Sequence, residues 1–503
     1  MARWIRRSLL GLAALTVVGV GACQLFWPER FAVNGPLLQM LLGRGIAAPP
    51  AATVAERLRA PDGFTVGRFA EDVPNARFLR FTPTGDLLVS QPRAGKILLL
   101  ERDADGDGRA DGRRILLDGL DRPHGMDLHD GWLYVAEGSA IARTRFDPEA
   151  RSVSGPIEHV VTGLPEGGNH WTRTVRFGPD GRMYVSVGSS CNVCLEKDPR
   201  RAAMLRFEPD GSGFELYATG LRNSVGFDWR PGTDELYATD NGRDLLGDDF
   251  PPCELNRIEQ GRFYGWPFAN GDRVIDPDYG AGHEADVART TPPVHAFRPH
   301  NAPLGMTFVR NANAPDEIRG AALVALHGSW NRTKKDGYQV VSLHWQDDGQ
   351  ITERPFLWGF LVDEDVIGRP VDVAEGPDGA IYVSDDYAGS IYRVAPGPAP
   401  PRRAELGAPS GERPSSAGDQ APVDSAALAR GRSLFDHYDC ASCHDPAKAA
   451  QGVVAKPLRG LAARYPIDDL DALLRTPTPP MPVFPLTAAE RRDLAVFLRA
   501  TYP

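Results

Sequence analysis

The sequence predicts an all-β propeller of six blades followed by a smaller all-α domain. Three observations predict this. A turn followed by an alternating strand recurs through a body at residues 61–395. A segment rich in proline, alanine and glycine follows at 396–424, and the last 79 residues, 425–503, contain helical patterns. Gly (53 residues) and Pro (44 residues) are frequent along the chain, which indicates many turns and short strands.

The repeating unit of the body is a tight turn and the strand after it. Pro fixes φ in such a turn and Gly accepts its positive φ, so the Pro-Asp-Gly copies have a physical reason. A second strand follows each copy, and repeats of this size built from turn-linked strands are typical of a propeller. The copies are residues 83–89, 129–135, 179–185, 231–237, 315–325 and 377–383, and the second strands are 96–100, 140–146, 203–207, 254–258, 338–343 and 390–394.

The N-terminal residues 1–27 have the pattern of an export signal. Arg3, Arg6 and Arg7 precede a charge-free run at residues 8–22, which is short for a spanning helix. Residues 20–23 (VGAC) resemble a lipoprotein cleavage box, and an uncleaved anchor is the alternative. Both place the protein in the periplasm, anchored to a membrane. An N-terminal segment, 28–60, then leads into the body.

In the 396–424 segment, 19 of 29 residues are Pro, Gly, Ala or Ser, which predicts a linker. The formal net charge of −10 provides no basic footprint for nucleic acid. No Gly-rich dinucleotide fingerprint lies between a strand and a helix, so NAD and FAD are poorly supported.

The tail carries a haem-attachment motif. Residues 440–444 read CASCH, in which Cys440 and Cys443 attach a haem c and His444 is the proximal iron ligand. Met481 is the expected second ligand, since a thioether opposite His suits electron transfer. The tail resembles a small class I cytochrome c. Two helices are expected in it: a first one carrying Gly431 and Phe435, and a last one. Thr487 and Glu490 open that last helix as a capping box, and its apolar face is Leu494, Phe497 and Leu498.

Two further clusters stand out in the body. Cys191 and Cys194 have CxxC spacing, for which a local disulfide and two buried thiols are both open, and Cys253 has no obvious partner. Asp103, Asp105 and Asp107, with Asp111, resemble the first part of a calcium loop. Residue 114 is Arg instead of the Glu that completes an EF-hand, so a solvated acidic hairpin is the alternative.

Several segments of the body occur in the order found in one known family. They are residues 168–173 (GNHWTR), 220–226 (GLRNSVG), 240–244 (DNGRD), 254–256 (ELN), 264–267 (YGWP), 302–306 (APLGM), 327–332 (HGSWNR) and 368–373 (GRPVDV). Through these segments the body resembles the glucose/sorbosone dehydrogenase family, and within it the sorbosone-dehydrogenase-like branch. The resemblance implies a six-bladed propeller that holds pyrroloquinoline quinone (PQQ) and calcium.

The resemblance also implies roles for residues. His170 is the general base, Arg222 polarises the reacting quinone carbonyl, and Asn223 helps to position it. Arg369 pairs with a cofactor carboxylate. Calcium sites are implied at two places: at the cofactor through the carbonyls of Gly242 and Arg243, and at a structural site through Glu254 and the carbonyl of Tyr264.

This chain departs from the family pattern at three places. His124, which we expect to contact the cofactor, stands where sugar-oxidising members carry Gln, and Val371 stands where a second Arg is expected. A cofactor-facing Lys is replaced within Trp330, Asn331 and Arg332, which we expect to contact the quinone. Arg298 and His300 are further candidates on the same face.

The sequence therefore predicts an extracytoplasmic PQQ-dependent dehydrogenase of sugars or aldehydes. Its haem would pass single electrons to a respiratory acceptor, such as the quinone pool or another cytochrome. Two alternatives remain open at this point: a calcium-dependent, sugar-lactonase-like hydrolase, and a degenerate propeller binding module with a cytochrome c tail.

Overall fold

The computed structural model describes residues 32–36, 45–312, 314–397, 425–438, 440–444, 458, 461, 467–475, 484 and 486–502. The chain divides into two compact units, Met1–Ala404 and Glu405–Pro503. The expected export signal at 1–27 and almost all of the expected linker at 396–424 lie outside the described residues. Among the described helices, none has the length and apolar character needed to cross a membrane.

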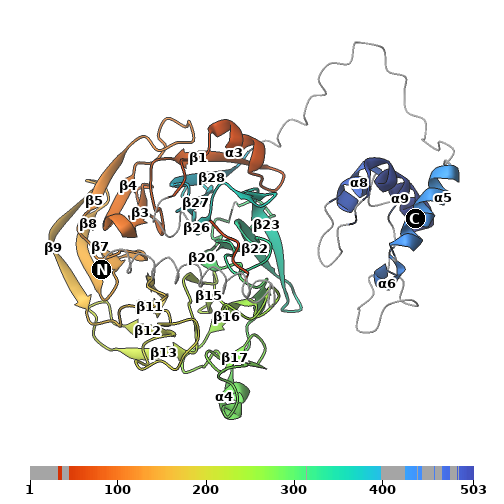
Figure 1. The fold of residues 1–503 in the computed structure, drawn as a ribbon. Helices are drawn as coiled ribbons and strands as arrows, with labels where there is room; N and C mark the ends of the chain where they lie inside the picture. Colours follow the sequence, from red (N-terminus) through yellow and green to blue (C-terminus); the bar gives the residue numbers. More distant parts are fainter. Residues whose placement is uncertain are drawn as a thin grey trace, which may run out of the picture. The chain divides into compact units, whose positions relative to one another are not determined.

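The first unit is a six-bladed β-propeller, as predicted. Six four-stranded antiparallel sheets lie in a ring (Figure 1). From innermost to outermost strand the first three blades are β2 (Leu79–Phe81), β3 (Leu87–Gln91), β4 (Lys96–Leu100) and β5 (Arg113–Leu117); β6 (Met126–His129), β7 (Trp132–Ala136), β8 (Ile141–Asp147) and β9 (Ser152–Val161); β10 (Arg173–Phe177), β11 (Met183–Val187), β12 (Ala203–Phe207) and β13 (Glu215–Thr219). The repeated turns of the sequence are the connections between first and second strands.

The other blades are built in the same way. They are β14 (Phe227–Trp229), β15 (Leu236–Asp240), β16 (Cys253–Ile258) and β19 (His295–Phe297); β20 (Pro303–Phe308), β21 (Ala322–Leu326), β22 (Gln339–Trp345) and β23 (Ile351–Leu357); β26 (Pro370–Glu375), β27 (Ile381–Asp385), β28 (Ser390–Pro396) and β1 (Phe64–Ala70). The outermost strand of the last blade is β1, so the start of the propeller closes the ring onto its end. This closure was not part of the sequence prediction.

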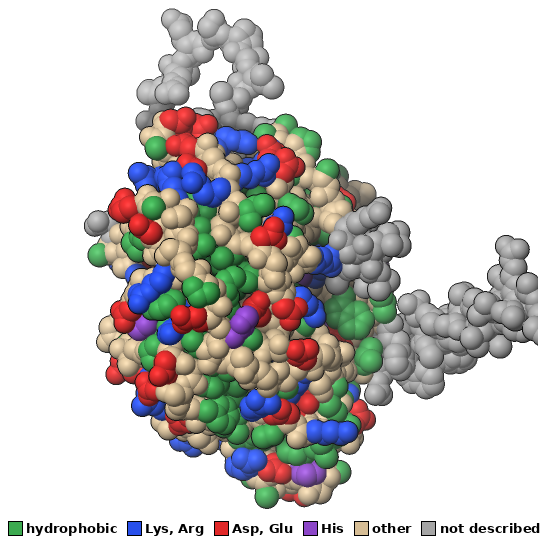
Figure 2. Space-filling model, turned by 90° about the vertical axis from the view of Figure 1, so that its left-hand side faces the viewer, with side chains coloured by type: hydrophobic (Ala, Val, Ile, Leu, Met, Phe, Trp, Pro, Cys, Tyr) green, Lys and Arg blue, Asp and Glu red, His purple; other side chains and the backbone are tan. Residues whose placement is uncertain are grey.

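Short elements decorate the blades. They are α3 (Ala51–Arg57), η1 (Pro92–Ala94), the pair β17 (Ala269–Asn270) and β18 (Val274–Ile275), α4 (Glu284–Arg289), and the pair β24 (Leu361–Val362) and β25 (Asp365–Val366). The core consists of apolar layers between neighbouring blades, for example Leu88, Val135 and Val371 in one cluster. Figure 2 shows acidic and basic side chains interspersed over one side of the molecule, without a continuous patch of either sign.

Three buried aspartates, one on every second blade, each join their blade to the next around the central channel. Asp127 on β6, Asp228 on β14 and Asp372 on β26 each accept a hydrogen bond of 2.8 Å from a backbone N–H at the innermost strand of the next blade. Arg176 and Arg310 lie beside Asp228 at 3.4 and 2.7 Å. Burial raises the pKa of Asp228, but these two arginines lower it by more than burial raises it. The net shift of its pKa is therefore downward.

Asp372 has the opposite shift, which gives a prediction about pH. Burial is the main cause that raises its pKa from 3.8 to about 7. The folded protein therefore holds this proton more tightly than the unfolded chain does. The stabilisation is complete below the unfolded pKa and is lost as the pH rises toward 7. In urea unfolding of the wild type, we expect the midpoint concentration to fall as the pH rises toward 7. This fall should be smaller in Asp372→Asn, since the amide keeps an acceptor for Leu79 without carrying a charge.

The matched control is Asp228→Asn, in the same position of another blade. It removes the carboxylate that pairs with Arg176 and Arg310, so we expect it to lower stability by about 3–5 kcal/mol at neutral pH. Equal pH slopes for the wild type and Asp372→Asn would contradict the prediction.

The second unit is helical in its described parts. It contains α5 (Ser425–His437), α6 (Ala441–His444), α8 (Ile467–Arg475) and α9 (Ala488–Thr501). Thr487 and Glu490 form the predicted capping box, and Leu494, Phe497 and Leu498 are buried, as expected. Gly431 lies where α5 meets α9: a Cβ there would lie 2.2 Å from the backbone oxygen of Asp493. A side chain at this position would therefore separate the two helices.

Candidate active site

One face of the propeller carries the residues that the sequence singled out. His124, His170, Arg222 and Arg369 each lie just before an innermost strand, namely β6, β10, β14 and β26. Because the first and second strands of a blade are antiparallel, the residues just after a second strand lie at the same end of the sheet. This brings residues 242–244 after β15 and 327–332 after β21 to the same face.

His170 is fixed in one tautomer. Its Nδ1 lies 3.0 Å from the carbonyl oxygen of Ser189 and 2.8 Å from the Ser189 hydroxyl, which itself donates to the Cys191 carbonyl at 2.7 Å. Both partners of Nδ1 are therefore acceptors, so Nδ1 carries the proton and Nε2 has a free lone pair. Burial, followed by the positive charge of Arg222, lowers the pKa of His170 to about 3. The imidazole is thus neutral at physiological pH.

Arg222 is held by main-chain and side-chain acceptors. Its Nε donates to the Asn192 carbonyl (2.9 Å) and its Nη2 to Asn192 Oδ1 (2.8 Å), while Nη1 donates to the Asn241 carbonyl (3.1 Å). Asp244 Oδ2 lies 3.2 Å from Nη2. Burial raises the pKa of Asp244, but His300, Arg222 and His170 outweigh it, so the net shift is downward and the carboxylate stays charged. Neither Asp244 nor Asn192 was assigned a role from the sequence.

Asn223 and His170 approach each other across Gly188. A Cβ on Gly188 would lie 2.6 Å from both Asn223 Oδ1 and His170 Cβ, so only glycine leaves room for the two side chains. The Asn223 backbone N–H donates to Asp240 Oδ1 at 2.5 Å. Asn223 Oδ1 is buried without a hydrogen-bond donor in the described part of the chain. The structure therefore brings His170 and Asn223 together, with Arg222 near enough for its charge to lower the pKa of His170, and the roles that the resemblance implies for the three residues stay predictions.

The implied calcium residues lie around β15 and β16. Asp240 and Glu254 are cross-strand partners, both buried. Burial and the neighbouring Glu254 raise the pKa of Asp240 to about 8, and burial raises that of Glu254 to about 7. Two buried carboxyls with raised pKa values fit a divalent cation, whose charge would offset their burial.

The backbone near this pair is also crowded with oxygens. A Cβ on Gly242 would lie 2.6 and 3.2 Å from the carbonyl oxygens of Pro252 and Pro251. The side chain of Arg243 points elsewhere, to Asp276 at 2.8 Å and Asp278 at 2.7 Å, so only its backbone is left for a metal. The hydroxyl of Tyr264 donates to the Arg257 carbonyl at 2.6 Å.

A positively charged pocket of about 300 Å³ opens on the same face. Four arginines line it, against one carboxylate, Asp386; the arginines are Arg77, Arg93, Arg122 and Arg369. Asp386 pairs with Arg77 at 2.8 Å and with His327 at 3.0 Å. Burial, followed by Arg369, lowers the pKa of His327 to about 4, so this ring is neutral. The pocket therefore has the charge to bind a ligand that carries several carboxylates.

Other predicted cofactor residues lie beside this pocket or pack against the chain itself. His124 is completely buried, 3.5 Å from Arg77 Nη2 and in ring contact with Trp171, and both of these neighbours line the pocket. Asn331 donates to the Ala32 carbonyl at 2.7 Å, and Trp330 accepts from the Asn34 backbone at 2.9 Å.

The remaining residues of this group contact loops of the same face. Arg332 donates to the carbonyls of Asp248 and Pro299. His300 donates to the Gly247 carbonyl at 2.8 Å, and Arg298 pairs with Asp336 at 3.0 Å. Segment 32–36 and loop 245–248 are thereby attached near the site.

Three smaller predictions concern cysteines and acidic residues. Cys191 and Cys194 form a disulfide, and Cys253 is a buried free thiol. Among the acidic residues, Asp103, Asp105 and Asp111 offer carboxylate oxygens within 4.8 Å of one another. Asp107 instead accepts from the Arg109 backbone at 2.8 Å.

The haem motif is described only in part. Cys440 is half-buried just before α6, and His444 ends that helix. The side chain of Cys443 and all of Met481 lie outside the described residues.

Comparison with known proteins identifies the family of the chain. The family model for glucose/sorbosone dehydrogenase matches residues 133–393. An uncharacterized protein of Borreliella burgdorferi is 32% identical over 290 residues, 55% of this chain and 76% of that protein. The pyrroloquinoline quinone-dependent pyranose dehydrogenase of Coprinopsis cinerea is 26% identical, over 69% of this chain and 56% of its own length. Aldose sugar dehydrogenase YliI of Escherichia coli is 25% identical, over 60% of this chain and 83% of its own length.

Solved structures share the fold. The PQQ domain of the Coprinopsis cinerea pyranose dehydrogenase has a TM-score of 0.58 at 21% identity and covers 69% of this chain and 98% of that domain. The calcium structure of a Trichoderma reesei family AA12 enzyme has a TM-score of 0.59 at 21% identity and covers 70% of this chain and 99% of that enzyme's chain. Together with the match over more than half of its residues, these findings place the chain: it belongs to the glucose/sorbosone dehydrogenase family.

Proposed function

We propose that the protein is a PQQ-dependent dehydrogenase that oxidises an aldose or a related sugar aldehyde such as sorbosone. The observation that carries this is the convergence of His170, Arg222 and Asn223 on the face that also holds the arginine-lined pocket. A neutral base, a fixed cation and a binding site for carboxylates are what oxidation of a sugar hydroxyl by an anionic quinone requires. The names of two relatives support a sugar substrate.

Arg369, Arg77 and Arg122 would hold the carboxylates of PQQ. The carbonyls of Gly242 and Arg243 would hold a calcium ion against it, near the buried pair Asp240 and Glu254. When bound, PQQ accepts a hydride, and with it two electrons, at a quinone carbonyl carbon.

The chain's own groups prepare this transfer. His170 Nε2 takes the proton of the substrate hydroxyl, and Asp244 stabilises the imidazolium that results. The second N–H of Arg222 Nη1 donates a hydrogen bond to the oxygen on which negative charge develops. Because Arg222 lowers the pKa of His170, an anion bound against Arg222 would raise it toward the range in which imidazole is an efficient base.

The second unit would carry the electrons onward. Cys440 and Cys443 would attach a haem c, and His444 and Met481 would hold its iron, which accepts one electron at a time. A respiratory acceptor, such as the quinone pool or another cytochrome, would then receive them. We propose a periplasmic protein anchored to the membrane by its N-terminus, and the Cys191–Cys194 disulfide supports an oxidising compartment.

The test is substrate-dependent reduction of the protein's own haem. Purified full-length protein is loaded with calcium and PQQ, mixed with a panel of aldoses and sugar aldehydes, and followed by the absorbance of ferrous haem. We expect haem reduction that requires both PQQ and sugar. Hydrolysis of a sugar lactone without PQQ would overturn the proposal, and so would a normal haem spectrum without any binding of PQQ.

Arg369 provides a prediction about cofactor affinity. We expect Arg369→Ala to weaken PQQ binding by about 10- to 100-fold, because a charge-assisted hydrogen bond contributes about 1.5–3 kcal/mol. Binding is measured by quenching of tryptophan fluorescence in calcium buffer. The control is Arg182→Ala, which removes a half-buried arginine that pairs with Glu208 at 3.1 Å next to the opposite end of β11. Equal affinities of the two variants would contradict this assignment.

A further inference from the structure

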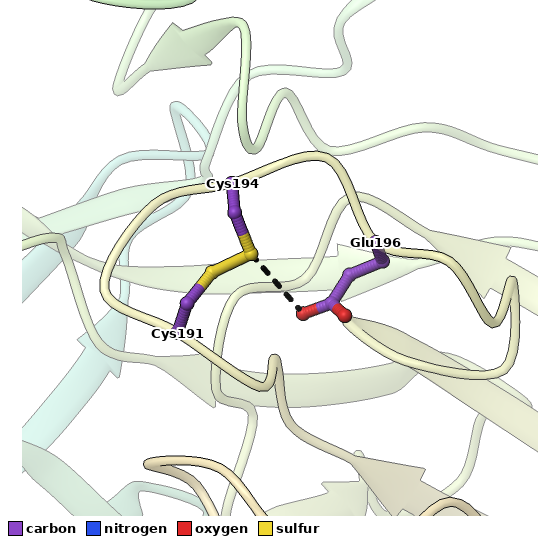
Figure 3. Close-up of side chains that lie close together, drawn as sticks. All are labelled: Cys191, Cys194 and Glu196. Atoms are coloured by element: carbon purple, nitrogen blue, oxygen red, sulfur yellow. Dashed lines mark hydrogen bonds between the residues drawn. A yellow bond between two sulfur atoms is a disulfide. The ribbon is translucent and has the colours of Figure 1, made fainter.

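The loop that follows β11 is closed by the disulfide Cys191–Cys194 (Figure 3). Glu196 folds back onto the start of this loop: its carboxylate accepts from the Ser190 backbone N–H at 2.5 Å and from the Ser190 hydroxyl at 2.8 Å. The loop is therefore fastened by a covalent bond and again by a hydrogen-bonded carboxylate. Two residues, Asn192 and Val193, lie between the cysteines.

Asn192 uses all of its side-chain polar groups, and its carbonyl as well, on the candidate site. Its carbonyl accepts from Arg222 Nε (2.9 Å) and from the indole N–H of Trp266 (3.3 Å). Its Oδ1 accepts from Arg222 Nη2 (2.8 Å) and from the Asp244 backbone N–H (2.8 Å), and its Nδ2 donates to the Asp244 carbonyl (3.1 Å). One residue thus contacts both members of the Arg222–Asp244 ion pair.

The same loop also reaches the base. The carbonyl of Cys191 accepts from the Ser189 hydroxyl at 2.7 Å, and the oxygen of that hydroxyl accepts from His170 Nδ1 at 2.8 Å. Since the Ser189 proton is committed to Cys191, the hydroxyl can only accept from His170. The loop therefore fixes the tautomer that leaves Nε2 free.

Asparagine supplies two groups at position 192: an acceptor for Arg222 and a donor to the Asp244 carbonyl. An aspartate would keep the acceptor for Arg222 but would place a carboxylate oxygen against the Asp244 carbonyl, where Nδ2 now donates. An alanine would keep only the backbone carbonyl of position 192 for Arg222 Nε, and Nη2 would lose Asn192 Oδ1 and be left with Asp244. The disulfide keeps the loop ordered, which lowers the entropy lost when Asn192 holds the guanidinium in place.

We propose that Asn192, fixed by the Cys191–Cys194 disulfide, is a positioning residue that aims Arg222 at the reacting oxygen, and that the Cys191 carbonyl of the same loop orients His170 through Ser189. The effect of this positioning on the reaction rests on the proposed function. The disulfide itself gives and takes no electrons in the reaction.

The experiment compares Asn192→Ala, Asn192→Asp and the double variant Cys191→Ser/Cys194→Ser in full-length, calcium- and PQQ-loaded protein. The disulfide is removed by substitution with serine and not by a thiol reductant, because a reductant would also reduce the quinone and the haem. We expect Asn192→Ala to lower kcat by about 10- to 100-fold, since it removes a hydrogen bond to a charged group. KM and PQQ affinity should stay within about threefold of the wild type.

Two graded outcomes are expected beside this. Asn192→Asp should retain more activity than Asn192→Ala, because it keeps the acceptor for Arg222, and the serine pair should lie between the wild type and Asn192→Ala. The control is Gln346→Ala. The amide of Gln346, on the exposed turn after β22, donates to the His344 carbonyl, and its removal should leave kcat unchanged. A fall in melting temperature without a fall in kcat would show a merely structural role and overturn the inference.

A second readout does not depend on activity. Crystal structures of the wild type and of Asn192→Ala without substrate should differ in the position of the Arg222 guanidinium. If the guanidinium keeps its place, the inference is wrong even where activity falls. If the wild type oxidises no sugar but Arg222 moves in the variant, the proposed function fails and the positioning role stands.

Discussion

Replacing His170 with alanine is expected to reduce kcat for sugar oxidation by about 10²- to 10⁴-fold, the usual contribution of a positioned general base. The reason lies in the hydrogen bonds of the ring. Its Nδ1 is committed to Ser189, and no described residue forms a hydrogen bond with Nε2, so this lone pair is left for a substrate hydroxyl. Alanine removes the acceptor, and the proton must then leave to water.

The measurement separates the base from the cofactor site. We expect His170→Ala to bind PQQ with nearly wild-type affinity, and its haem to show a normal ferrous spectrum after chemical reduction. The control is His159→Ala, an exposed histidine on β9 that pairs with Glu137 at 2.7 Å, and this variant should keep full activity. Retention of kcat by His170→Ala would assign the proton transfer to another group and would remove the main support for the mechanism.

The propeller was predictable because its evidence is local. Each turn and each alternating strand lies within about ten residues, so the pattern at residues 179–185 predicts β11 without knowledge of the rest of the chain. The closing strand β1 is different. It precedes the first repeat and pairs with β28 more than 300 positions away, and nothing in residues 64–70 specifies that partner.

The candidate site was only partly predictable, for a related reason. His170, Arg222 and Asn223 lie in motifs that carry a family resemblance, and the structure brings them together. Arg77 could also have been noticed, since it precedes β2 as His124, His170 and Arg369 precede their innermost strands. Asn192 gave no signal of its own, because its partners Arg222 and Asp244 lie 30 and 52 positions away.

The ionisation of buried carboxyls is a further property that residue type does not reveal. Asp228 and Asp372 occupy matching places on β14 and β26, yet the pKa of one is lowered and that of the other is raised. The difference comes from Arg176 and Arg310, which lie beside Asp228. Such charges come from neighbouring blades, so only the assembled ring determines which carboxyl stays protonated.

Arg222 gives the second large expected effect. We expect Arg222→Gln to lower kcat by about 10²- to 10³-fold, the usual cost of removing one donor to a developing oxyanion. Arg222→Lys should fall between the wild type and the glutamine variant. Lysine keeps the positive charge but not the two-point contact of Nε and Nη2 with Asn192.

The same substitution should change His170 in a way that needs no substrate. Burial and Arg222 together lower the pKa of His170, so removing the positive charge must raise this pKa from about 3 toward the ordinary value of 6.5. Histidine NMR titrations of Arg222→Gln, Arg222→Lys and the control Arg182→Gln measure the shift directly. An upward shift in the glutamine variant alone would show that Arg222 acts on His170 through its charge. An unchanged pKa would mean that the two groups are not electrostatically coupled, and Arg222 could then not adjust the base when an anion binds beside it.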